Sequence, residues 1–277
     1  MSALINDDER LSNLQIRRRV LLQNHLNRLK QSPTETLLLD GGTGEELFIR
    51  GVPDDRKLWS AAAIVTEQYH TVVEDVHRSF LMAGSQAITT NSYGITPGVG
   101  FTDGEEVERL VGIAGYIARR AVTMMSSSFN PCALVLGSLG PLVESYRPDL
   151  RMNHSDGVVA YKYAVQGLYP HIDVYLIETM SCVEETFQAI EAISIFYIGF
   201  QNPSLTKHPL LVSFTLNQAG NLRDGEAVVT AIPIVIEYAR QKKVNRKSRH
   251  SLLVFHYACE LTVLWCTKSG WSSIQLL

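Results

Sequence analysis

Two hydrophobic patterns alternate along the chain. Short, continuous apolar runs end in small and polar residues, and each is followed by a longer segment in which apolar residues recur every three or four positions. The first pattern is typical of buried parallel strands and the second of helices with one face on a core. With their loop residues, the expected strands are 37–39, 85–94, 132–141, 173–179 and 209–216.

The segment from Leu58 to about Ala83 illustrates the helical pattern. Its expected core-facing stripe consists of Val72, Val73, Val76, Phe80 and Leu81. Its polar residues fall mainly on the other faces, so we expect His70 and His77 to lie in solvent. Further helices are expected to end near Met125, Leu168 and Arg240.

Strand and helix alternate five times, which predicts a parallel sheet with right-handed crossovers. Polar residues at successive strand ends favour the α/β class and a (β/α)8 TIM-barrel type. Residues 252–255 are a possible sixth strand, and no well-formed unit follows it, so the barrel is predicted to be incomplete, with five to six βα units. Three regions are expected: a helical prefix (1–35), the barrel units (36–240) and an atypical tail (241–277).

Composition disfavours nucleic-acid-binding, membrane-spanning and secreted classes of protein. The 277 residues carry a formal net charge of -3, which disfavours nucleic acid as the main partner. No apolar segment approaches the roughly 20 residues of a membrane span, and an acidic N-terminus disfavours a secretory signal. The four cysteines show no C-x-x-C spacing, so a reduced, cytoplasmic protein is expected. The basic run 241–250 is interpreted as a solvated loop rather than a nucleic-acid patch.

The first candidate site is Asp40-Gly41-Gly42, which directly follows an apolar run. Glycines allow a sharp turn and a close ligand approach, and a carboxylate at this edge could receive a substrate ammonium or hydroxyl group. Asp40 could instead cap the next helix. The pattern also resembles the phosphate loop of sugar kinases, but the second such loop is missing, since Asp224-Gly225 is followed by Glu226.

Other strand ends carry further candidates. Thr90 and Asn91 suit a polar ligand, although they could form an ordinary turn. Glu178 is a second carboxylate, which could clamp an ammonium group together with Asp40 or share acid–base work with it. Backbone contacts alone could also satisfy Glu178. Cys182 lies just beyond, near the start of a helix, and is a candidate reactive thiol only if it is exposed.

Taken in order, the motifs resemble the homocysteine S-methyltransferase family over about residues 36–240. The shared motifs are Leu39-Asp40-Gly41-Gly42-Thr43-Gly44, Leu58-Trp59-Ser60-Ala61, Thr89-Thr90-Asn91-Ser92-Tyr93-Gly94, Gly137-Ser138-Leu139-Gly140-Pro141, Ile177-Glu178-Thr179, Val212-Ser213-Phe214-Thr215 and Leu222-Arg223-Asp224-Gly225. Each motif is weakly specific alone, whereas the ordered set is fairly specific.

The resemblance implies a barrel that binds homocysteine, partly through Asp40 and Glu178, and makes methionine. Family members bind zinc through three cysteines, in a Gly-x-Asn-Cys and a Gly-Gly-Cys-Cys pattern. The zinc lowers the thiol pKa, and the thiolate attacks the methyl group of a sulfonium or betaine-type donor. S-methylmethionine, S-adenosylmethionine and betaine are the donor types implied.

The chain departs from the family where the metal should bind. Neither cysteine pattern is present. Cys259 lies about where the first ligand would fall and is the one zinc-ligand candidate; Cys266, seven residues on, is a poor substitute for an adjacent pair. From Val244 the resemblance ends, and a truncated gene, a splice variant or a shifted reading frame would each give this pattern.

Two functional hypotheses follow. The chain is a methyltransferase of this family, or it is a non-catalytic remnant that acts as a binding or interaction protein. A free thiol of pKa ~8.5 is only a few per cent thiolate at pH 7, so catalysis without zinc should be poor. An open barrel also leaves strand edges uncovered, which predicts possible self-association.

Overall fold

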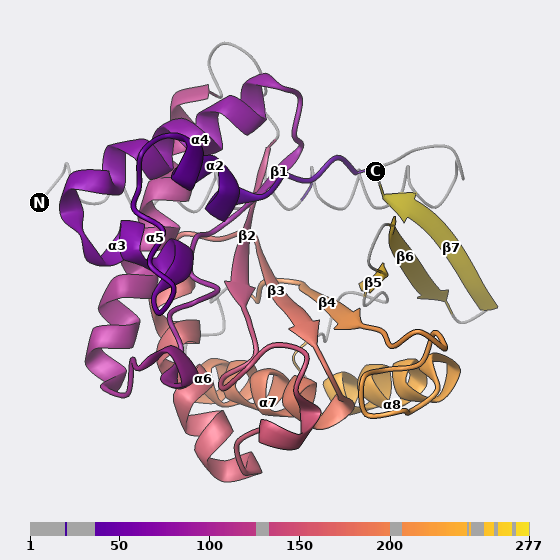
Figure 1. Ribbon diagram of the computed structural model, residues 1–277. Coiled ribbons are helices and arrows are strands. Elements are labelled where there is room, and N and C mark those ends of the chain that lie inside the picture. Colours follow the sequence, from indigo (N-terminus) through magenta and orange to yellow (C-terminus); the bar gives the residue numbers. More distant parts are fainter. Residues whose placement is uncertain are drawn as a thin grey trace, which may run out of the picture.

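The computed structural model in Figure 1 describes residues 37–125, 133–199, 207–242 and 244, the backbone of three C-terminal strands, and Val20. One seven-stranded sheet runs in chain order. Its strands are β1 (Ala87–Thr89), β2 (Leu134–Leu139), β3 (Val174–Met180), β4 (Leu210–Thr215), β5 (Leu252–Tyr257), β6 (Glu260–Thr267) and β7 (Gly270–Leu276). Strands β1 to β5 pair in parallel, and β6 and β7 continue the sheet as antiparallel neighbours.

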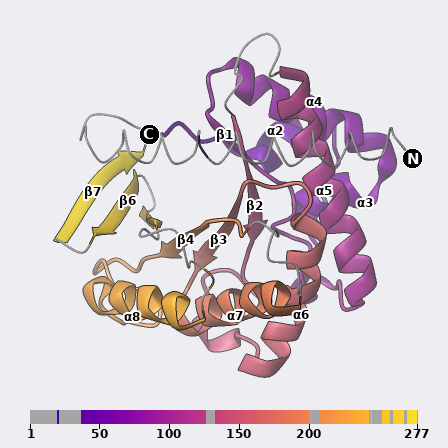
Figure 2. The same cartoon turned by 180° about the vertical axis from the view of Figure 1, so that it is seen from behind.

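Helices follow the parallel strands and pack side by side in chain order. The α-helices are α2 (Thr43–Ile49), α3 (Ala62–Val65), α4 (His70–Met82), α5 (Gly104–Met125), α6 (His154–Leu168), α7 (Val183–Gly199) and α8 (Val228–Gln241). In Figures 1 and 2, α4 and α5 flank β1 and β2, whereas α6, α7 and α8 form a row beside β2 to β4. This outer layer of helices around a parallel sheet is the TIM-barrel type that the alternation predicts.

Two strands in the middle of the sheet are buried throughout. Every residue of β2 and β4 is buried. At the amino end of the sheet, Asp173 accepts the Val135 N–H at 2.9 Å and forms an ion pair with Arg119 of α5 at 2.8 Å. This buried pair ties β2 and β3 to the helical layer, far from the carboxyl ends of the strands where ligands bind.

The predicted strands are present as β1 to β5, with one exception. Residues 37–40 belong to no helix or strand. The Gln86 N–H does donate to the Leu38 carbonyl at 2.8 Å, but the Leu38 N–H bonds to the Gln86 side chain and the Thr89 N–H to the Asp40 side chain. Side chains thus replace the backbone ladder, so this segment runs beside β1 without becoming a strand.

The prediction for α4 is correct for its apolar face and wrong for His77. Val73, Val76 and Leu81 are buried as expected. His77 is completely buried, and burial lowers its pKa to about 4. Because α4 packs against α2 and β1 as well as α5, its polar side is covered too. His70 is half-buried, and its Nε2 lies 2.8 Å from the Ile64 carbonyl oxygen.

Several sequence predictions fall outside the described residues. Of the predicted prefix (1–35) only Val20 is described, and it is helical. Cys259 and most of the basic run 241–250 are not among the described residues either. The β6–β7 hairpin is a feature that the sequence analysis did not predict. None of the described helices is long and apolar enough to cross a membrane.

Candidate functional site

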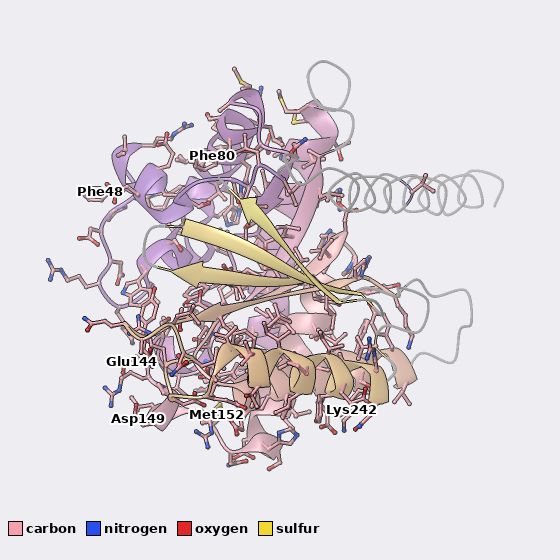
Figure 3. All side chains as sticks on the ribbon, turned by 90° about the vertical axis from the view of Figure 1, so that its right-hand side faces the viewer. Phe48, Phe80, Glu144, Asp149, Met152 and Lys242 are labelled. Carbon is pink, nitrogen blue, oxygen red and sulfur yellow. The ribbon has the colours of Figure 1, made fainter. Side chains whose placement is uncertain are left out.

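The loops that follow the strands gather at one end of the molecule. In Figure 3, Glu144, Asp149 and Met152, which follow β2, lie at that end, whereas Lys242, just after α8, lies at the opposite end. Asp40 and Glu178 both come from the carboxyl-end side of the sheet. This is the side on which α/β barrels bind their ligands.

Asp40 is held by one residue of β1. Its Oδ2 accepts the Thr89 N–H at 2.7 Å, and its Oδ1 accepts the Thr89 hydroxyl at 2.9 Å. Burial raises the pKa of Asp40 to about 6 against the opposing effect of these hydrogen bonds. The N-cap of α2 is Gly42, and that helix has no side-chain cap, so Asp40 does not serve as its cap.

Glu178 lies near the end of β3 and accepts a hydrogen bond from the Ser138 hydroxyl of β2. Burial raises the pKa of Glu178 to about 7, the Ser138 hydrogen bond opposes this, and the charge of Asp40 raises it further. The two carboxylates therefore lie within electrostatic range of each other. Like charges in a poorly solvated site favour keeping a proton on one of the pair.

A local irregularity sets the position of Glu178. The register between β3 and β4 shifts between Ile177 and Met180, and Thr179 has a φ of 64°. This left-handed conformation is unfavourable for a β-branched residue, and such strain concentrates at functional sites. The bulge breaks the alternation of β3, so that both Glu178 and Thr179 are half-buried at the rim.

Of the two glycines, Gly41 has a clear packing reason. A Cβ there would lie 2.8 Å from the Phe80 ring of α4, so any other residue at this position would force that ring to move. At Gly42 a Cβ would meet nothing closer than 3.8 Å. Ligand contact by either glycine stays a prediction.

Thr90 and Asn91 are buried and engaged with the protein itself. The Thr90 hydroxyl accepts the Ser138 N–H at 3.0 Å and bonds to the Ser92 hydroxyl at 2.8 Å. The Asn91 amide donates to the Ser60 carbonyl at 2.9 Å. Thr90 thus orders Ser138, which in turn holds Glu178. Direct contact of Thr90 or Asn91 with a ligand stays a prediction.

Sequence reasoning missed the two hydroxyl residues that hold the carboxylates. Thr89 and Ser138 were parts of motifs, but neither was singled out as a site residue. The available signal was a serine within an otherwise apolar, fully buried strand, because a buried hydroxyl needs a partner. Thr89 and Ser138 thus hold the carboxylates of Asp40 and Glu178 in place.

The described residues do not provide the three-cysteine zinc site that the resemblance implies. Cys259 lies outside them, and the side chain of Cys266 in β6 is not described. Cys182 is buried, and burial raises its pKa to about 12. Because Cys182 is not exposed, it does not meet the condition for a reactive thiol that the sequence analysis set. Its sulfur lies beside Glu184 and Asp224.

Comparison with known proteins agrees with the fold and the motifs. The family model described as homocysteine S-methyltransferase matches residues 37–244. The homocysteine S-methyltransferase of Escherichia coli is 29% identical over 233 residues, which is 78% of this chain and 70% of that protein. Homocysteine S-methyltransferase 1 of Saccharomyces cerevisiae is 29% identical over 120 residues, 40% of this chain and 36% of the yeast protein.

Solved structures give the same result. The metallated form of the homocysteine methyltransferase MmuM from Escherichia coli superimposes with a TM-score of 0.63 at 24% identity, covering 84% of this chain and 86% of that one. Its oxidized form gives 0.61 at 27% identity, covering 76% and 72%. Since the family model spans residues 37–244 of 277, the chain belongs to the homocysteine S-methyltransferase family.

Proposed function

We propose that the chain binds homocysteine between Asp40 and Glu178 and transfers a methyl group from a sulfonium or betaine-type donor to its thiol, giving methionine. The observation that carries the proposal is the pair of half-buried carboxylates at the ligand-binding end of the sheet, where the charge of Asp40 raises the pKa of Glu178. Family membership supports the reaction class.

An α-ammonium group is the ligand part that fits this pair. Each free carboxylate is disfavoured by burial, and Glu178 is disfavoured further by the charge of Asp40. A positive charge between them relieves both effects, because an opposite charge nearby favours the ionised form. Thr89 and Ser138 keep the carboxylates oriented while the ligand exchanges. The charges thus hold the amino acid by its backbone end and leave its thiol free to react.

The proposed reaction is a nucleophilic displacement. The thiol gives its proton to solvent, the thiolate sulfur forms a bond to the methyl carbon, and the bond from that carbon to the donor heteroatom breaks with its electron pair staying on the donor. The positive charge of the donor is lost in the step. A free thiol of pKa ~8.5 is mostly protonated at neutral pH, so turnover without a further activating group should be slow.

Binding measurements with two ligands test the site. Calorimetry would compare L-homocysteine with 4-mercaptobutanoate, which differs only by lacking the α-amino group. We expect the wild-type chain to prefer homocysteine by at least tenfold and Asp40→Ala to lose that preference while keeping its fold. Asp149→Asn, which changes an exposed carboxylate of the β2–α6 loop, is the matched control. Equal affinity of both ligands for the wild-type chain would contradict the placement of the ammonium group.

A methyl-transfer assay then addresses turnover and the donor. S-methylmethionine, S-adenosylmethionine and betaine would each be supplied with homocysteine, and methionine would be measured. Methionine formed from one donor and lost in Glu178→Gln would support the enzyme. Tight homocysteine binding without methionine from any donor would favour the non-catalytic alternative. We place the protein in the cytoplasm, where its scattered cysteines would remain reduced.

A further inference from the structure

Three potential metal ligands meet beyond the end of β3. The Cys182 sulfur and one carboxylate oxygen each from Glu184 and Asp224 all lie within 4.8 Å of one another. Cys182 directly precedes α7 and Glu184 lies in its first turn, whereas Asp224 belongs to the loop between β4 and α8. We propose that these residues bind one divalent metal ion of the zinc type. This site shares no residue with the proposed amino-acid site and does not rest on the proposed methyl transfer.

The spacing suits a small divalent ion after minor movement. Zinc bonds of about 2.3 Å to sulfur and 2.0–2.2 Å to oxygen place tetrahedral ligands roughly 3.3–3.6 Å apart. Cys182 is buried and fixed, while Glu184 and Asp224 are exposed. Rotation of the two exposed side chains toward the fixed sulfur closes the remaining distance.

The Cys182 sulfur lies within 4.8 Å of a carboxylate oxygen of Glu184. A metal ion that bridges these two atoms would displace the proton of the thiol, which passes to solvent. The bound ion would then stabilise the thiolate.

The surrounding charge favours a cation, because Glu184 and Asp224 are both acidic and both exposed beside the sulfur. Glu185 is held in place by the Ser181 N–H at 2.8 Å. The Ser181 hydroxyl, next to Cys182, is fully buried and has no hydrogen-bond partner among the described residues. A buried polar group of this kind calls for a partner such as a water or an ion.

The ligand types indicate which metal fits. A sulfur ligand selects zinc and similar transition ions over magnesium and calcium, which prefer oxygen alone. Three protein ligands leave one position of a tetrahedral ion for water. The residues differ from the three cysteines implied by the family resemblance, of which this chain lacks both sequence patterns.

Cobalt titration of the full, metal-stripped chain tests the proposal. Cobalt bound to a thiolate gives a charge-transfer band in the near ultraviolet, and zinc should displace it. We expect the band at one ion per chain in the wild type and in Cys259→Ser/Cys266→Ser. We expect it to vanish in Cys182→Ser, and the affinity to fall at least tenfold in Asp224→Asn and Glu184→Gln.

The exposed carboxylate variants keep the test decisive if Cys182→Ser misfolds. Replacing exposed side chains should leave the circular dichroism spectrum unchanged, so weaker binding would report ligation alone. Asp149→Asn is the matched acidic control and should bind cobalt like the wild type. A band that survives Cys182→Ser, disappears in Cys259→Ser/Cys266→Ser, or keeps full affinity in both carboxylate variants would overturn the proposal.

Discussion

Two pairs of carboxylates lie at the carboxyl-end rim of the sheet, and they differ in burial. Asp40 and Glu178 are withdrawn from solvent and held by the hydroxyls of Thr89 and Ser138. Glu184 and Asp224 are exposed and share their place with the Cys182 thiol.

The difference in burial shows how carboxylates can suit two kinds of positively charged ligand. Burial makes the first pair sensitive to protonation and ready for a single positive charge, because desolvation disfavours each ionised form. The exposed pair pays no such cost of desolvation, and in the proposed site a divalent ion bonds to both of its carboxylates and to the Cys182 sulfur.

The largest expected effect is a loss of homocysteine affinity when the pair of Asp40 and Glu178 is disrupted. Replacing Glu178 by Gln removes one charge from the pair, and homocysteine affinity should fall about 100-fold, since losing one partner of a buried charge pair is costly. Glu184→Gln changes the exposed pair in the same way and should leave homocysteine affinity within twofold of the wild type. Calorimetry at pH 8 measures both. A similar loss in the two variants would show that burial does not distinguish the pairs.

Glu178→Gln should lower the affinity for homocysteine but raise the free energy of unfolding of the ligand-free chain. The pKa of Glu178 is raised from 4.5 to about 7 in the folded chain, so the folded state holds a proton that the unfolded state releases above pH 4.5. This costs no stability below that pH, an increasing amount up to pH 7 and a constant amount above it. Without ligand, Glu178→Gln should therefore raise the free energy of unfolding at pH 8 by about 1–3 kcal/mol, and by little at pH 4.

Urea unfolding at the two pH values measures this prediction. Glu184→Gln is again the control, and an exposed substitution should change stability by no more than about 0.5 kcal/mol. A Glu178→Gln gain of equal size at pH 4 and pH 8 would show that the effect does not come from ionisation.

The affinity for homocysteine should also depend on pH. The ammonium group needs both carboxylates ionised, and their pKa values are about 6 and about 7. Affinity should rise about tenfold per pH unit between pH 6 and 7, where one proton leaves on binding, and level off above pH 7.5. In Asp40→Asn only one titrating carboxylate remains, so the profile should be shallower below pH 6. A flat wild-type profile from pH 5 to 8 would contradict the proposed site.

The sequence predicts the order of strands and helices better than it predicts the contacts between side chains. Asp40 and Glu178 were found because each ends an apolar run, and parallel strands bring their ends to one edge. Local pattern could not show that Gln86 and Asp40 side chains replace a backbone ladder, which is why residues 37–39 were wrongly predicted to be a strand. His77 was misplaced because helical periodicity describes one buried face, whereas α4 is covered on more than one side.

The contacts that define both clusters join distant parts of the chain. Ser138 meets Glu178, and Cys182 meets Asp224, across about 40 intervening residues in each case. No spacing rule predicts such pairs, since they depend on strand register and on the bulge near Thr179. The family resemblance located the motif that contains Ser138 but did not give its role.

The smallest expected effect is a pH-dependent loss of homocysteine affinity in Ser138→Ala, which tests the role of the Ser138 hydroxyl. Its hydroxyl favours the ionised form of Glu178, so Ser138→Ala should raise the pKa of that carboxyl above about 7. Homocysteine affinity should then fall about threefold to tenfold at pH 6.5 and recover by pH 8.5, where Glu178 is ionised in both proteins. Ser145→Ala, which removes the hydrogen bond to the Tyr93 hydroxyl instead, is the control. A loss of affinity that is the same at both pH values would mean that Ser138 supports the packing of β2 rather than the charge of Glu178.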